Sequence, residues 1–260
     1  HAFPPGRRVT HENVDLNRNF FDFGAGRALP VNEGYAQLHP LLLPEQWPPT
    51  AENQAAIDAW IAEHGIKAYQ AAVTAGQYQF ADGLFYGGTA PTWSNKTFRQ
   101  VLREHAQAAR GLAWIDLHTG LGPNGHGERI FACSDDKAAY ARANAWWGSA
   151  DAPVTSIYDG SSSSALLNGL MWNSIYEECP QAEFTAIALE YGTLPMLDVT
   201  GALRADHWLH KPAAKASPEL AASIRARMLE AFYTDTDAWK GQIISQARQA
   251  MFQAVDGLAG

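Results

Sequence analysis

The sequence predicts an α/β fold in which a mixed, mostly parallel central sheet carries helices on both faces. Two strand-like runs support this, A-W-I-D-L-H-T-G at 113–120 and A-I-A-L-E-Y-G-T at 186–193, because helix-like patterns lie before, between and after them. The chain has 260 residues, of which 47% are hydrophobic, enough to bury one sizeable core. Nothing in the composition requires a second domain, so we expect residues 1–260 to form a single one.

The first half of the chain contains one clear helix signal. From 24 to 49 the sequence is rich in Gly and Pro, which favours an irregular surface segment. Thr50 then precedes a pattern in which Ile57, Trp60 and Ile61 share one face, so Thr50 is the predicted N-cap of a helix. The run at 68–73 is typical of a short strand.

The remaining elements follow in order. An aromatic-rich loop is predicted at 76–94, where the rings either line a cleft or pack locally, and a helical face at 98–105 leads into the first central strand. Two helices are predicted at the end of the chain, one opened by Ser217 and Pro218, the other with the face Trp239, Ile243, Ala247 and Met251.

Both central strands end in a residue that can perform chemistry. His118 closes the first run and Glu190 lies near the end of the second. Open α/β sheets bind ligands in the crevice beyond the carboxyl ends of their strands, which makes His118 a candidate metal ligand. The alternative is a hydrogen-bonded core or loop histidine. A glutamate that ends an apolar strand is costly unless it is paired or functional.

A third polar segment lies near the beginning, in N-V-D-L-N-R-N-F at 13–20. The guanidinium of Arg18 has a fork of donors that suits a carboxylate, and Asn17 adds an amide donor beside it. The structural alternative is a turn cap with an ion pair.

In this order and spacing, the three segments resemble the zinc carboxypeptidase superfamily. The match is nearer to a bacterial branch of uncharacterised proteins, through D-L-H-T-G-L-G-P, G-L-F-Y-G-G and E-E-C-P-Q-A-E. The resemblance implies that His118 is a zinc ligand and Glu190 the catalytic base. It also implies that Asn17 and Arg18 hold the terminal carboxylate of the substrate.

Two further roles follow from the resemblance alone. An arginine upstream of the N-R pair polarises the scissile carbonyl in that superfamily, which by position makes Arg8, or else Arg7, the candidate. Its alternative is a solvated surface cation. The segment T-S-I-Y-D-G-S-S-S-S resembles the loop with a mobile tyrosine, which places Tyr158 over the substrate.

The chain departs from that superfamily at the first zinc motif. The superfamily carries H-x-x-E before its N-R pair, and no such motif is present here. We expect that an N-terminal portion with this motif is missing, so that the chain as given binds zinc weakly, or that the site is assembled differently. Other candidate ligands are His126 and Glu128 in a glycine-rich loop, and the H-x-x-H pair His207 and His210, for which a solvated corner is the preferred interpretation.

The resemblance implies a zinc-dependent hydrolase that cleaves a C-terminal peptide bond of a substrate with a free carboxylate. One alternative is an N-acyl amino acid deacylase with the same metal site. The other is a non-catalytic binding module, because the H-x-x-E ligands are absent.

The composition of the chain argues against nucleic acid and membranes as partners. A formal charge of −8 and a pI near 5.5 provide no basic surface for nucleic acid. No apolar run approaches the ~20 residues needed to span a bilayer. Cys133 and Cys179 are too few for a disulfide framework, although they allow one disulfide. We therefore expect a reduced, cytoplasmic location. The resemblance implies a peptide or N-acyl amino acid as substrate, and the oligomeric state is not predicted.

Overall fold

The structure is a computed structural model that describes residues 7–24, 26 and 28–260. The chain forms an α/β domain whose contacts divide into two compact units. Unit 1 contains the described residues up to Lys96, Ala165–Met171 and Leu197–Leu229. Unit 2 contains Thr97–Ser164, Trp172–Met196 and Glu230–Gly260.

Unit 2 is built on a four-stranded sheet with the order β1-β4-β2-β3. β1 is parallel to β4, β2 is parallel to β3, and β4 and β2 are antiparallel. The predicted mixed, mostly parallel sheet is confirmed. The strands are β1 Gly111–Asn124, β2 Gly127–Phe131, β3 Thr155–Ser156 and β4 Glu183–Gly192.

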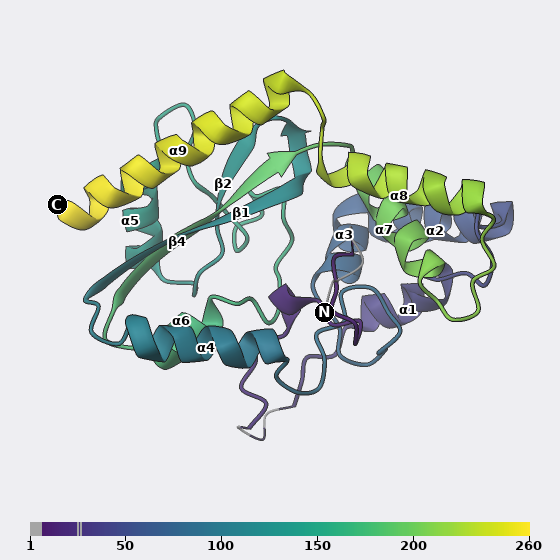
Figure 1. Cartoon of the computed structure of the whole chain (residues 1–260), viewed down its shortest axis with the longest axis horizontal. Helices are drawn as coiled ribbons and strands as arrows, with labels where there is room; N and C mark the ends of the chain where they lie inside the picture. Colours follow the sequence, from purple (N-terminus) through teal and green to yellow (C-terminus); the bar gives the residue numbers. More distant parts are fainter. Residues whose placement is uncertain (1–6, 25, 27) are drawn as a thin grey trace. The chain divides into compact units, whose positions relative to one another are not determined.

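Helices cover both faces of this sheet, as predicted (Figure 1). On one face, Arg142 of α5 donates to the hydroxyl of Thr185 at 3.0 Å, and Trp147 of α5 donates to the carbonyl of Ala250 in α9 at 2.9 Å. On the other face, α4 and α6 each place an aromatic ring against a strand. The helices are α4 Trp93–His105, α5 Lys137–Trp147, α6 Asn173–Glu178 and α9 Asp237–Ala259, and the ring pairs are Phe98 with Trp114 and Tyr176 with Phe184.

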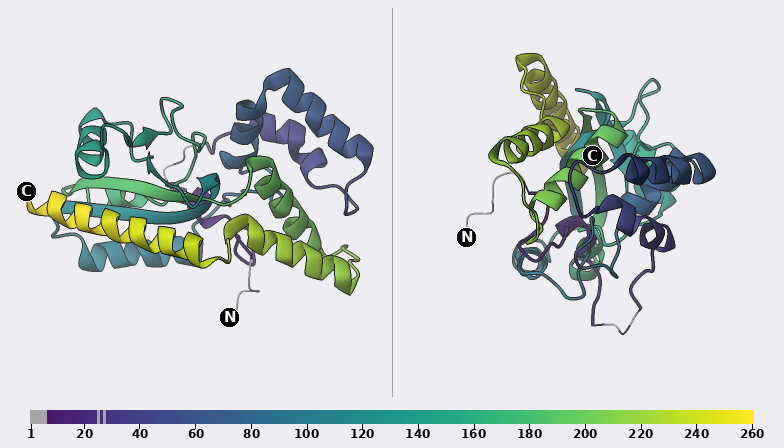
Figure 2. Two further views of the ribbon diagram at one scale, coloured as in Figure 1. Left: turned by 90° about the horizontal axis from the view of Figure 1, so that it is seen from above. Right: turned by 90° about the vertical axis from the view of Figure 1, so that its right-hand side faces the viewer.

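The long helix α9 runs along the strands of unit 2 (Figure 2, left). It is anchored by buried side chains at Trp239, Ala247, Ala250 and Ala254. Small residues at these helical spacings allow close approach to the neighbouring elements. The predicted inward face is confirmed at Trp239 and Ala247, whereas Met251 is exposed.

Unit 1 is mainly helical within its described residues. Arg204 of α7 donates to the carbonyl of Leu42 at the end of α1 and to the side chain of Asn53 in α2, both at 3.0 Å. Ile224 of α8 is buried with Ala205 and Trp208 of α7. The helices are α1 Glu33–Leu42, α2 Ala51–His64, α3 Ile66–Thr74, α7 Met196–Leu209 and α8 Pro218–Phe232, after a 3-10 turn at Leu16–Arg18.

Two predictions for unit 1 are wrong. Where an irregular segment was predicted, Asn32 caps α1 by accepting the Tyr35 N–H at 2.9 Å. Tyr35, Leu38 and Leu42 are buried at helical spacing, and this burial outweighs the neighbouring prolines. The strand predicted at 68–73 is part of the helix α3, because its buried residues recur three and four apart rather than alternating.

The predicted N-cap at Thr50 is confirmed. Its hydroxyl accepts the Asn53 N–H at 3.2 Å at the start of α2. We expect Thr50→Ala to lower the free energy of unfolding by about 1 kcal/mol, because an N–H of the first turn loses its acceptor. Denaturant titration measures this loss. Glu63→Ala, an exposed change in the last turn of α2, is the control and should stay within about 0.5 kcal/mol.

Both cysteines are buried and free, so the single disulfide that the sequence allows is not formed. Burial raises the pKa of the Cys133 thiol to about 12, which keeps it protonated and unreactive. Within the described residues, no helix combines the length and the apolar character needed to cross a bilayer.

Candidate functional site

β1 and β4 bring His118 and Glu190 together. The two strands are parallel and in register over nine residues, and His118 pairs directly with Glu190 one position before this regular pairing ends. Paired residues of neighbouring strands point to the same face of a sheet. The prediction that both residues lie at carboxyl ends of central strands is confirmed for Glu190 on β4, but it is wrong for His118, because β1 is an edge strand that continues to Asn124.

Asp116 orients the imidazole of His118. It lies two residues earlier in β1, hence on the same face, and its Oδ2 is 2.8 Å from Nε2 of His118. Both side chains are only partly buried, at 28% exposure for His118 and 19% for Asp116. This contact fixes the plane of the ring and favours the tautomer with the proton on Nε2.

A glycine-rich segment after His118 contacts Glu190. The pairing of β1 with β4 shifts register between Thr119 and Asn124, and in the bulge the Leu121 N–H donates to Glu190 Oε1 at 3.0 Å. The bulge lies directly against Gly192. Only a glycine fits at this position, because a Cβ there would lie 2.1 Å from the carbonyl oxygen of Pro123. The bulge thus fixes the Glu190 carboxylate at the end of its strand.

Glu128 lies on the other side of Glu190, in the antiparallel strand β2. Its carboxylate accepts from the Thr155 hydroxyl at 2.6 Å and from the Ser163 N–H at 3.1 Å, and also from the Ser163 hydroxyl. We call Asp116, His118, Glu190 and Glu128 the polar row. His126, the other loop candidate, is exposed just before β2.

The polar row does not by itself form a zinc cage. Among the described residues, no group of three or more His, Cys, Asp and Glu side chains is arranged to hold a metal ion. The carboxylate partner of His118 is the kind of group that a metal-binding histidine usually has, but a catalytic zinc takes three protein ligands. The residues present therefore do not fit a complete site, and zinc stays a prediction.

Tyr158 belongs to the same unit as the polar row. Its ring is 40% exposed and its hydroxyl donates to the carbonyl of Cys133. Partial burial raises the pKa of Tyr158, with the neighbouring Cys133 and Asp135 acting in the same direction. The hydroxyl is thus a neutral donor, and its role over a substrate stays a prediction.

Arg8 and Arg18 both lie in unit 1, on either side of a buried carboxylate. Arg8 Nε donates to Asp15 Oδ2 at 2.8 Å. Burial by itself would raise the pKa of Asp15, but the positive charges of Arg8 and Arg18 and the Asn17 N–H hold it below its usual value. The ring of Phe85 lies 5.0 Å and 5.5 Å from the two guanidinium carbons.

The donors of Arg18 serve the chain's own carbonyl groups. Nε and Nη2 donate to the Thr74 carbonyl at 3.0 and 2.7 Å, and Nη1 donates to the Asn17 carbonyl at 2.6 Å. The side chain is only 3% exposed, and burial lowers its pKa to about 10. The Asn17 side-chain oxygen accepts the Met171 N–H at 3.0 Å. These contacts stabilise the backbone around Asn17 and Arg18. Binding of a substrate carboxylate by these two residues stays a prediction.

The solvated corner predicted for His207 and His210 is wrong. His207 lies in α7 and is 8% exposed, and its Nε2 is 2.6 Å from the carbonyl oxygen of Asp82. Nδ1 of His210 contacts the Asp206 carbonyl at 2.8 Å. The pair is part of the packing of unit 1, because the inward face of α7 extends through its last turn.

Sequence reasoning missed two features of the polar row. Asp116 was not assigned a role, although its position two residues before His118 in a strand indicates a shared face. Glu128 was considered only as a loop residue, whereas it belongs to β2. The antiparallel pairing of β2 with β4 could not be read from local pattern, because it depends on a long-range contact.

Comparison with known proteins gives a family but no function. No curated protein and no solved structure matches the chain. A family model matches residues 1–246, nearly the whole chain, and its description assigns no activity, so the relation to zinc carboxypeptidases stays a prediction. The chain belongs to the family described as "Protein of unknown function (DUF2817)".

Proposed function

We propose that this protein is a hydrolase that cleaves an amide bond in a substrate with a free carboxylate, with Glu190 as general base. The observation that carries the proposal is the direct pairing of His118 with Glu190 near the end of the regular pairing of two parallel strands, with Asp116 bound to the imidazole. Convergent, partly exposed polar groups at such an edge are typical of an active site.

The residues of the polar row have distinct chemical roles in this proposal. Glu190, held by the Leu121 N–H, takes a proton from the attacking water and returns it to the leaving amine. Asp116 holds the ring of His118 in one orientation beside Glu190, its pairing partner on β4. Zinc comes from the resemblance alone, so no step is assigned to it here.

The class of substrate also rests on the resemblance. It implies either a C-terminal peptide bond or the acyl bond of an N-acyl amino acid, with Asn17 and Arg18 on the carboxylate. For Arg18 to bind a substrate, some of its bonds to the Thr74 and Asn17 carbonyls must be exchanged for bonds to the ligand. Such an exchange keeps the number of charge-assisted hydrogen bonds constant.

A substrate panel tests the proposal. We expect the chain to hydrolyse peptides or N-acyl amino acids with a free carboxylate, and to act about tenfold or more slowly on the same compounds with an amidated terminus, because the charged contact is lost. The panel is run with and without added zinc, and the rate per chain is compared. Equal rates on free and amidated substrates would contradict the carboxylate requirement.

One observation favours a second candidate, a binding module. Within the part of the chain that the structure describes, no group of three or more His, Cys, Asp and Glu side chains is arranged to hold a metal ion. In that case the same carboxylate-bearing compounds bind without turnover. Calorimetric titration together with the measured zinc content per chain separates this candidate from the hydrolase.

A further inference from the structure

One flank of α9 is apolar and exposed. Ile244, Met251, Phe252, Val255 and Leu258, which we call the α9 stripe, are between 49% and 64% exposed. The buried residues of the helix lie on a different face, at Ala247, Ala250 and Ala254. Five large apolar side chains on one solvent-facing flank are more than the single exposed residues that a monomeric surface usually carries.

Four residues of the stripe, Ile244, Met251, Val255 and Leu258, are separated by seven, four and three positions, a spacing that keeps side chains on one side of a helix. Phe252 lies next to this row. Arg248 lies four residues after Ile244 and four before Phe252, and its aliphatic stem can cover apolar surface.

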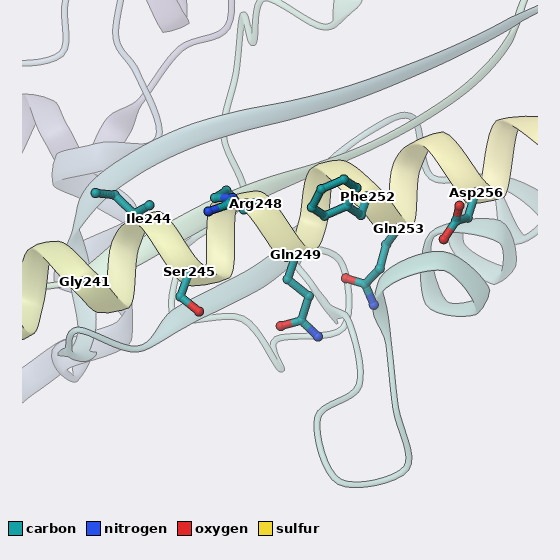
Figure 3. Close-up of a pocket in the computed structure, with 8 residues that line it drawn as sticks. All are labelled: Gly241, Ile244, Ser245, Arg248, Gln249, Phe252, Gln253 and Asp256. Atoms are coloured by element: carbon teal, nitrogen blue, oxygen red, sulfur yellow. The ribbon is translucent and has the colours of Figure 1, made fainter.

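A shallow hollow runs along the same helix from Gly241 to Asp256, with Ile244, Arg248 and Phe252 among its lining residues (Figure 3). Gly241 leaves one end of the hollow open, since a Cβ there would meet nothing within 4 Å. Gln253, also in the lining, has a buried side-chain oxygen without a hydrogen-bond partner among the described residues.

The charges of this surface are arranged symmetrically about Phe252. Arg248 lies four residues before it and Asp256 four residues after it. Both side chains are exposed, and within the described part of the chain neither forms an ion pair. At 1.5 Å per residue they lie about 12 Å apart along the axis, too far to bind each other.

We propose that the surface of α9 around Phe252, with Arg248 and Asp256 on either side, binds the same surface of a second copy of this chain, antiparallel, about a two-fold axis at Phe252. Such an axis relates residue 252 − n of one helix to residue 252 + n of the other. It therefore places each Arg248 opposite the Asp256 of the other copy, which forms two equivalent ion pairs around a central pair of Phe252 rings. A different partner would not require opposite charges at equal distances on both sides of one aromatic residue.

The family match ends at residue 246, so four of the five residues of the stripe lie beyond it. The proposal does not depend on the hydrolase function, because α9 contributes no residue to the polar row.

Charge reversal tests the geometry. Sedimentation velocity of the 260-residue chain is expected to show a dimer. Arg248→Asp and Asp256→Arg should each weaken it by about tenfold or more, because each puts like charges opposite one another. An equimolar mixture of the two variants should form heterodimers, in which every pair is again complementary. Lys137→Asp, an exposed change of the same charge on α5, is the matched control and should leave the dimer intact.

Formation of the heterodimer in the mixture also shows that both charge variants are folded. A wild-type chain that stays monomeric at every concentration tested would overturn the proposal. So would variants that dimerise as tightly as wild type, or a mixture that does not associate. Phe252→Asp should abolish the dimer, and a dimer that persists in this variant would place the interface elsewhere.

Discussion

Replacing His118 with alanine is expected to lower the rate of amide hydrolysis by about 100-fold or more. The change removes the imidazole that the Asp116 carboxylate holds beside Glu190. Asp116→Asn should have a smaller effect, about tenfold, because the ring remains but its orientation and proton position are less well fixed. Initial rates on the best compound of the substrate panel measure both effects.

His105→Ala is the matched control for this change. His105 is an exposed histidine of the same unit, at the end of α4, and its removal should leave the rate within about twofold of wild type. If His118→Ala retained the wild-type rate, His118 would have no part in the reaction.

Acidification from pH 6.5 to about 4 is expected to destabilise unit 1 through His207. Burial lowers the pKa of His207 to about 4 in the folded chain, whereas an unfolded histidine titrates near 6.5. Between these values the unfolded state binds more protons, so the free energy of unfolding falls as the pH decreases. The shift corresponds to about 3 kcal/mol, fully lost once the pH is below 4.

The neighbouring Asp206 acts in the opposite direction. Burial raises the pKa of Asp206, so its protonation favours the folded state as the pH decreases. The prediction therefore concerns the difference between wild type and His207→Gln, a variant with a neutral side chain that can still donate to the Asp82 carbonyl. Wild type should lose about 3 kcal/mol more than the variant between pH 6.5 and 4 in denaturant titrations. Parallel pH profiles would contradict a buried neutral His207.

The sequence predicts the central part of unit 2 well, because two strong apolar runs dominate it. β1 and β4 lie where A-W-I-D-L-H-T-G and A-I-A-L-E-Y-G-T predict them, and their parallel pairing brings His118 to Glu190. The register follows from placing both polar ends at the same edge of the sheet. The helices α8 and α9 were also predicted, since their helical spacing is regular.

The errors arise where composition and spacing disagree. The segment of α1 is rich in Pro and Gly, yet its apolar residues recur at helical spacing, and burial of that face decides the structure. For His207, the local sequence contains charged and polar neighbours, and only tertiary packing of α7 buries the ring. Glu128 joins the polar row through a long-range antiparallel pairing that no local pattern encodes.

The hydrolase proposal makes one carboxylate of the polar row essential and its neighbour dispensable. Glu190 and Glu128 are paired on adjacent strands, but Glu128 is occupied by the hydroxyl groups of Thr155 and Ser163 and by the Ser163 N–H. The most direct measurement is the hydrolysis rate of Glu190→Gln and Glu128→Gln beside wild type, with substrate affinity measured in parallel. Glu190→Gln should lose about 100-fold or more in rate at unchanged affinity, whereas Glu128→Gln should stay within a few-fold of wild type. Equal rates for Glu190→Gln and wild type, or a greater loss in Glu128→Gln, would contradict the assignment of Glu190 as the general base.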